Sequence, residues 1–133
     1  MSRYPQGKLI IKILLEFSRF YALILSMFDH YQKALSAIAR LLKTRFPDRI
    51  EHIYAFGSRV RGDYGEGSDF DVLIVVKNRT PDIEREIISI IVDAELSMDM
   101  SFTPVIKDSS SFAKEREVNS PFYTNIMHEG MPL

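Results

Sequence analysis

The segment "DFDVLIVV" (69–76) constrains the fold of this chain more than any other stretch, because five apolar residues follow its second aspartate without a break. Successive side chains of a β-strand point to opposite faces of its sheet, so a strand reads as continuously apolar when both faces are buried. We therefore expect a strand at 69–76, within a sheet that other elements cover on both sides.

The segments around this strand have the patterns of helices and of two further strands. The pair Asp29 and Gln32 resembles a capping box, Thr80 precedes a proline, and Gly130 occupies the place of a C-cap glycine. We expect helices at 29–45, 80–97 and 120–129, a short helical piece after Gly57-Ser58, and strands at 49–56 and 98–106. With an N-terminal helix, the order α-α-β-α-β-α-β-α predicts an α/β sandwich with a small mixed sheet.

Length and composition narrow the function classes. The chain has 133 residues, which is enough for one core but not for separate catalytic and substrate domains. Its net charge of −1 gives no overall positive field for non-specific binding of nucleic acid. It contains no cysteine, which excludes disulfides and cysteine-ligated zinc and is typical of a cytoplasmic protein.

The N-terminal stretch "KLIIKILLEFSRFYALILSMF" (8–28) is strongly apolar but is interrupted by Lys12, Glu16 and Arg19. Each of the two basic residues costs roughly 2.5–3.5 kcal/mol at a bilayer centre, so a membrane span is disfavoured. We expect an amphipathic helix that packs on the domain or on a partner, with a homo-oligomer as one option. The predicted organisation is an extension at 1–28, with Met27 as an alternative start, and a domain at 29–133.

Two aspartates stand at the entrance to the apolar strand. Asp69 and Asp71 project from the same face because strand side chains alternate, and two such carboxylates suit a shared Mg2+ ion. Ten residues before Asp69, Gly57-Ser58 provides a close backbone approach, a hydroxyl donor and a following helix N-terminus for phosphate. Arg59, Arg61 and Ser68 complete the candidate phosphate-binding set. Each piece alone is common in turns, whereas their conjunction is specific for a metal–triphosphate site.

The sequence Gly57-Ser58, ten residues, then Asp69-x-Asp71 resembles the signature of the polymerase-β-like nucleotidyltransferases, and the short chain resembles their minimal nucleotidyltransferase (MNT) branch. The resemblance covers about 29–133, including the ending "SPFYTNIMHEGMPL". It implies a small mixed sheet flanked by helices, and transfer of a nucleoside monophosphate from a Mg2+-bound triphosphate such as ATP. It also implies that Gly57 and Ser58 hold the triphosphate, while Asp69 and Asp71 bind Mg2+.

The family pattern has a third carboxylate on the neighbouring strand. Asp99, at the beginning of the expected strand 98–106, is the candidate for this base or second-metal ligand. Ser101 and Thr103 would share its face by alternation, and either could occupy the family's acid position. A capping or solvated aspartate is the alternative interpretation of Asp99.

The resemblance also implies a partner. MNT proteins are often paired with a HEPN-domain toxin, a helical RNase, which they neutralise as antitoxins by transferring AMP to it or by binding it. We therefore expect a Mg2+-dependent nucleotidyltransferase that acts on a partner protein, without direct sequence-specific binding of nucleic acid. The alternatives are a catalytically weak or inactive antitoxin that works by binding, and an accessory subunit that transfers nucleotide to a small-molecule acceptor.

Overall fold

The computed structural model describes residues 6–57, 60 and 70–133, with the backbone alone for residues 24 and 28. The chain consists of two compact units, Met1–Ala34 and Leu35–Leu133. The second unit contains the sheet and all the elements that cover it.

Helix α1 (Gln6–Arg45) is one continuous element. The prediction of a new helix starting at Asp29 is wrong, because no glycine or proline interrupts the sequence between Lys8 and Arg45. Asp29 is not an N-cap but forms an ion pair with Lys33, one turn later, at 2.8 Å. None of the helices in the described part of the chain is long and apolar enough to cross a membrane.

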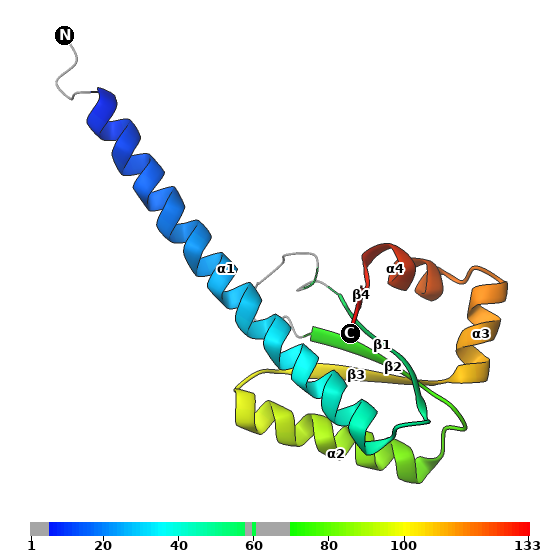
Figure 1. Cartoon of the computed structure of the whole chain (residues 1–133). Coiled ribbons are helices and arrows are strands. Elements are labelled where there is room, and N and C mark those ends of the chain that lie inside the picture. The colour runs from blue at the N-terminus through cyan, green and yellow to red at the C-terminus, as the bar shows by residue number, and fades with distance from the viewer. Residues whose placement is uncertain (1–5, 58–59, 61–69) are drawn as a thin grey trace. The chain divides into compact units, whose positions relative to one another are not determined.

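The sheet has four strands in the order β3-β2-β1-β4 (Figure 1). Their bounds are Ile50–Phe56 for β1, Phe70–Val76 for β2, Phe102–Asp108 for β3 and Met131–Pro132 for β4. Strand β2 is antiparallel to β1 and parallel to β3, and β4 is antiparallel to β1. The sheet is therefore mixed, as the sequence predicted.

Three helices follow β2 in the chain: α2 (Pro81–Met98), α3 (Ser109–Glu117) and α4 (Pro121–Glu129). The predicted helix starts at Thr80 and Ser120 are confirmed. Both residues are N-caps, because the Thr80 hydroxyl accepts from the Ile83 N–H at 3.3 Å and the Ser120 hydroxyl from the Tyr123 N–H at 3.1 Å. Helix α3 was not predicted, because it is polar and buries only Phe112. Gly130 caps α4 with an extended backbone, and a Cβ there would lie 2.4 Å from the Ile126 carbonyl oxygen.

Both faces of β2 are buried, which confirms the interpretation of its apolar run. Val72, Ile74 and Val76 are fully buried on the face covered by residues 35–45 of α1 and by α2. Leu73 and Val75 point to the other face and form a cluster with Phe112 of α3 and Ile126 of α4. The helices thus make one layer on each side of the sheet, as in the predicted sandwich.

The third strand begins later than the sequence suggested, at Phe102 instead of residue 98. Helix α2 runs to Met98, and Asp99 then adopts a left-handed backbone with φ 52° and donates its N–H to the Glu95 carbonyl. The helix therefore ends by a C-cap turn where the sequence analysis placed strand residues. The alternation that put Ser101 and Thr103 on the face of Asp99 does not apply across this turn.

Candidate functional site

The predicted site residues that the structure describes lie at one end of the sheet. Strand β1 ends at Phe56, and its antiparallel neighbour β2 begins beside it, so that Asp71 is the Cα partner of Phe56. Strand β3 runs parallel to β2, which puts its first residues and the end of α2 at the same edge. The sheet topology therefore brings Gly57, Asp71 and Asp99 to one end of the domain.

Gly57 lies against the carboxylate of Asp71. Its backbone has φ +93°, a conformation that glycine adopts readily and other residues rarely. A Cβ built on Gly57 would lie 2.2 Å from Asp71 Oδ2 and 3.1 Å from its Cγ. The glycine that begins the predicted phosphate turn thus lets a backbone segment touch the carboxylate of the predicted metal ligand.

The neighbours of Asp71 follow from the strand register. Asp71 is half-buried and shares its face of β2 with Leu73. Its partner on β3 is Thr103, which is exposed, at the spacing of about 4.8 Å that separates neighbouring strands. On the β1 side, the ring of Phe56 makes an edge contact with Phe122 of α4, with centroids 5.8 Å apart. The carboxylate therefore stands between an aromatic side and a hydroxyl side.

Asp99 lies outside any strand. It is exposed at the C-cap of α2, and Glu95 supports the turn after it by accepting the Phe102 N–H at 2.9 Å. The Phe70 N–H donates to the Ser101 carbonyl at 3.3 Å, which joins this turn to the start of β2. The position directly beside Asp71 is held by Thr103, which the sequence analysis named as one alternative occupant.

The remaining predicted site residues lie outside the described residues. They are Ser58, Arg59, Arg61, Ser68 and Asp69. Among the residues that are described, no group of three metal-ligating side chains is close enough together to hold an ion. The carboxylate of Asp71 is nevertheless the hard oxygen donor that Mg2+ takes in proteins, and its contact with Gly57 places it beside the predicted phosphate turn.

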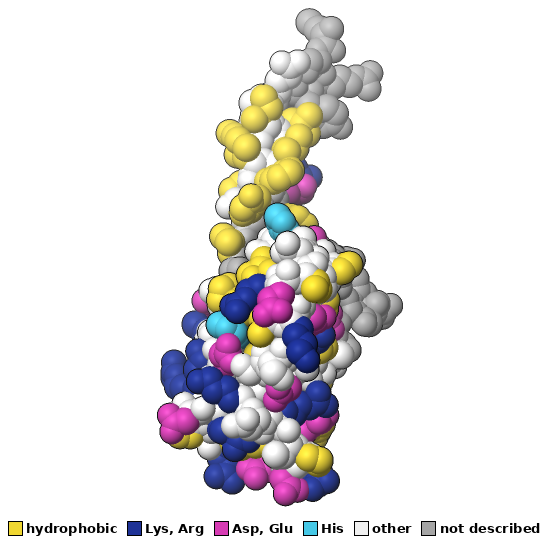
Figure 2. All heavy atoms as spheres, turned by 90° about the vertical axis from the view of Figure 1, so that its right-hand side faces the viewer, with side chains coloured by type: hydrophobic (Ala, Val, Ile, Leu, Met, Phe, Trp, Pro, Cys, Tyr) yellow, Lys and Arg dark blue, Asp and Glu magenta, His cyan; other side chains and the backbone are white. Residues whose placement is uncertain are grey.

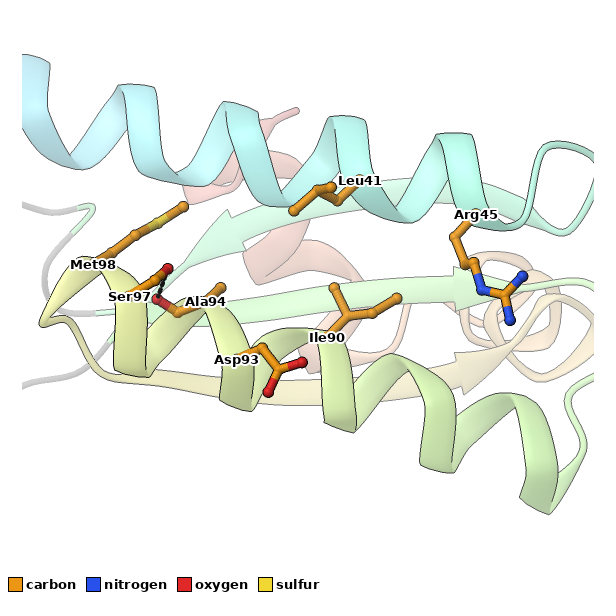
Figure 3. A pocket seen from close by; sticks show the side chains of 7 residues that line it. All are labelled: Leu41, Arg45, Ile90, Asp93, Ala94, Ser97 and Met98. Atoms are coloured by element: carbon orange, nitrogen blue, oxygen red, sulfur yellow. Dashed lines mark hydrogen bonds between the residues drawn. The ribbon is translucent and has the colours of Figure 1, made fainter.

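A groove of about 470 Å3 lies in the other helix layer, between α1 and α2 (Figure 3). Its lining residues are Leu41, Arg45, Ile90, Asp93, Ala94, Ser97 and Met98. Arg45 is already paired with Glu86 at 3.0 Å, and the Ser97 hydroxyl donates to the Ala94 carbonyl at 3.3 Å. The lining is mostly apolar and lies on the opposite side of the sheet from Asp71, so it does not match the chemistry of a triphosphate.

Sequence reasoning did not single out Phe56 or Phe122 as neighbours of the site. Both are partly buried aromatic residues that pack on the cluster under α3 and α4. In a sequence, such residues cannot be told apart from ordinary core residues. The strand register alone reveals that Phe56 is beside Asp71.

Comparisons with known proteins identify a matching family and similar proteins. Residues 35–122 match the family model of the nucleotidyltransferase domain. Two candidate protein adenylyltransferases of Methanocaldococcus jannaschii are similar: one is 31% identical over 77% of this chain and 96% of its own length, the other 34% identical over 62% and 78%. A crystal structure of a candidate nucleotidyltransferase from Sulfolobus solfataricus is 23% identical, with a TM-score of 0.41 over 75% of this chain and 76% of that one.

Proposed function

Since this chain belongs to the nucleotidyltransferase domain family, we propose that it transfers AMP from ATP to a hydroxyl group of a partner protein. The observation that carries the proposal is the contact between Gly57 and the Asp71 carboxylate at the open end of β2. The similarity to two proteins named as candidate protein adenylyltransferases supports the choice of AMP and of a protein acceptor.

In the proposed site, Asp71 and Asp69 would hold Mg2+ with carboxylate oxygens, and the turn at Gly57-Ser58 would hold the triphosphate. Bound Mg2+ supplies positive charge that neutralises the triphosphate and the pyrophosphate leaving group. Arg59, Arg61 and Ser68 add donors to the phosphate oxygens. Gly57 keeps the phosphate turn and the Asp71 carboxylate within contact distance, so the nucleotide is oriented by a rigid strand end.

The chemical step is a substitution at the α-phosphorus of ATP. The acceptor oxygen forms a bond to this phosphorus, the bond from it to the oxygen bridging to the β-phosphate breaks, and pyrophosphate leaves. The hydroxyl proton passes to a carboxylate at the site, for which Asp99 is the proposed acceptor as the third acid. Asp99 lies at the same end of the sheet as Asp71, on the turn that is hydrogen-bonded to Phe70.

The proposed partner is a HEPN-domain toxin, with the chain acting as its antitoxin. The acceptor would be a hydroxyl group on the surface of this partner, presented to the end of the sheet where Asp71 lies. The choice of a HEPN-domain toxin rests on the resemblance to MNT antitoxins, and it is tested with the partner protein itself.

A second candidate function is antitoxin action by binding, with little or no transfer. The observation that favours it is Thr103, which occupies the β3 position directly beside Asp71 and cannot serve as a carboxylate ligand or base. Under this alternative the domain keeps Mg2+–ATP binding and forms a complex with the toxin, whereas transfer to the toxin is absent.

The experiment that separates the two functions is incubation of the full chain with Mg2+, the protein encoded by the neighbouring gene, and ATP, GTP, CTP or UTP labelled at the α-phosphate. We expect label on the partner from ATP, and its loss in Asp71→Asn. The matched control is Asp93→Asn, an exposed carboxylate of the groove in the other helix layer, which should transfer normally. ATP binding and complex formation without label on the partner would overturn transfer and support the binding function.

A further inference from the structure

The N-terminal part of α1 has an apolar surface that the proposed transfer reaction does not use. Twelve large apolar side chains described between Leu9 and Met27 are exposed, each over 38–62% of its surface. Figure 2 shows hydrophobic side chains covering this segment on the face turned to the viewer. An exposed apolar surface of this kind marks an interaction site, since soluble proteins rarely leave such patches uncovered.

The apolar residues follow a seven-residue repeat. Ile10, Leu14, Phe17 and Tyr21 are spaced by four, three and four residues, which is the a/d spacing of a coiled coil. The spacing continues along the sequence through Tyr31 to Leu35, Ile38 and Leu42. These last three side chains are 0–1% exposed in the core of the second unit. The repeat is therefore buried by the domain at the C-terminal end of α1, whereas between Leu9 and Met27 no described residue covers it.

The charged residues of the segment avoid this apolar seam. With Leu14 and Tyr21 as a positions, Lys8 is at b, Glu16 is at c, and Lys12 and Arg19 are at f. Positions b, c and f lie on the side of a helix away from the seam. Two copies of the segment can therefore pack together without bringing like charges into the interface.

The exposed area matches what a stable dimer needs. Nine of the twelve exposed side chains belong to the a, d, e and g positions of the repeat, and most of these are more than half exposed. With about 165 Å2 of accessible surface per residue in an extended chain, they present roughly 800 Å2. Each partner in a standard protein interface contributes about the same area, ~800 Å2.

We propose that residues 9–27 of α1 pack against the same segment of a second copy, so that the chain forms a homodimer through paired helices. The interface is self-complementary, as a two-fold dimer requires, because the a/d seam of one copy fits the holes of the other. This dimer does not depend on the transfer reaction, since its residues are separate from Asp71, Gly57 and Asp99.

The test measures the mass of the full chain in solution by sedimentation equilibrium, and compares two neighbouring substitutions. Leu14 and Leu15 are both leucines with 62% and 57% exposure, but Leu14 is in the seam at a and Leu15 is outside it at b. We expect the wild type to have twice the 15.4 kDa chain mass, Leu14→Glu to weaken the dimer at least tenfold, and Leu15→Glu to leave it unchanged.

Circular dichroism of both variants confirms that the helix content is kept. A wild type that is monomeric at micromolar concentration would overturn the proposal, and so would equal weakening by the two substitutions. Sedimentation with phosphatidylserine–phosphatidylcholine vesicles is the parallel measurement. A monomer that binds these vesicles, with binding lost in Leu14→Glu, would assign the surface to lipid instead of to a second copy.

Discussion

The two faces of β2 are built from neighbouring residues but serve different purposes. On the face under α1 and α2, Val72, Ile74 and Val76 are all fully buried. On the face under α3 and α4, Leu73 and Val75 are equally buried, but the row begins with the half-buried carboxylate of Asp71. One face of β2 is therefore wholly apolar, whereas the other carries a carboxylate at the start of the strand.

The difference between the two faces is set at a single end of the strand. Because side chains alternate, a charge at position 71 leaves the face of Val72 wholly apolar. The carboxylate contacts the backbone at Gly57, where a Cβ would lie 2.2 Å from Asp71 Oδ2. The faces should therefore respond differently to substitution: one should lose stability and the other activity.

The largest expected effect is that of Asp71→Asn on nucleotidyl transfer. Under the proposed function, loss of the charge removes a ligand of Mg2+ that contributes several kcal/mol to transition-state stabilisation, so the rate should fall roughly 10³-fold or more. Pyrophosphate release under saturating Mg2+–ATP measures the rate. As a control for folding, the urea unfolding midpoint of the variant should be close to that of the wild type. A transfer rate within tenfold of the wild type would contradict the proposed role of Asp71 as a metal ligand.

Ile74→Ala should give the opposite result on the other face. Ile74 is fully buried, and truncation leaves a cavity that should lower the free energy of unfolding by roughly 2–5 kcal/mol. Urea denaturation measures this loss, while the transfer rate per folded molecule should stay near that of the wild type. A large loss of transfer in the folded protein would show that the two faces are not functionally separate.

Asp99→Asn should reduce transfer about 10²-fold if Asp99 is the third acid, since general-base catalysis contributes at least this much. Thr103→Ala, at the β3 position beside Asp71, is the comparison variant and should transfer normally if Asp99 and not this position supplies the base. Full activity of Asp99→Asn would end its assignment as the third carboxylate.

Gly57→Ala should reduce transfer by about 10–100-fold, because displacing a reacting group by about 1 Å has an effect of this size. A Cβ at this residue would lie 2.2 Å from Asp71 Oδ2, and the backbone has φ +93°. Gly7→Ala is the control, since nothing lies within 4 Å of a Cβ there. Equal transfer by both variants would contradict the coupling of the phosphate turn to Asp71.

The smallest effect concerns the N-cap of α3. Hydrogen bonds from the Ser110 hydroxyl and from the backbone N–H groups of Arg79 and Ser110 lower the pKa of Asp108 below its ordinary 3.8. Because the pKa of Asp108 is lower in the folded protein, the ionised carboxylate stabilises the fold at pH values above its ordinary pKa of 3.8. This stabilisation is lost as the pH falls through the pKa of the folded protein. Asp108→Asn keeps an N-cap side chain but cannot ionise. Between pH 5 and pH 3, the melting temperature of this variant should therefore fall slightly less than that of the wild type.

The sequence predicted the elements whose signals are local. The apolar strand at 69–76 and the helix starts at Thr80 and Ser120 each depend on neighbouring residues, and the structure confirms all three. Helix α3 escaped prediction because its stability comes from the packing of Phe112 and not from an apolar stripe. The start of β3 was misplaced because Asp99 takes a left-handed conformation that an aspartate adopts only in some turns.

The candidate site was predictable as a set of residues but not as a geometry. The spacing of Gly57-Ser58 and Asp69-x-Asp71 names the residues, whereas the contact of Gly57 with Asp71 depends on the antiparallel register of β1 and β2. The same holds for Thr103, whose place beside Asp71 follows from the parallel register of β3. Long-range pairing of strands decides both facts, and no local pattern encodes it.

The most direct test of the central claim is the intact mass of the proposed HEPN-domain partner after incubation with this chain, Mg2+ and ATP. The proposed function predicts that the partner gains the mass of one or more adenylyl groups with the wild type and none with Asp71→Asn. An unchanged partner mass, in a mixture where the wild type binds both ATP and the partner, would contradict protein adenylyl transfer at this site.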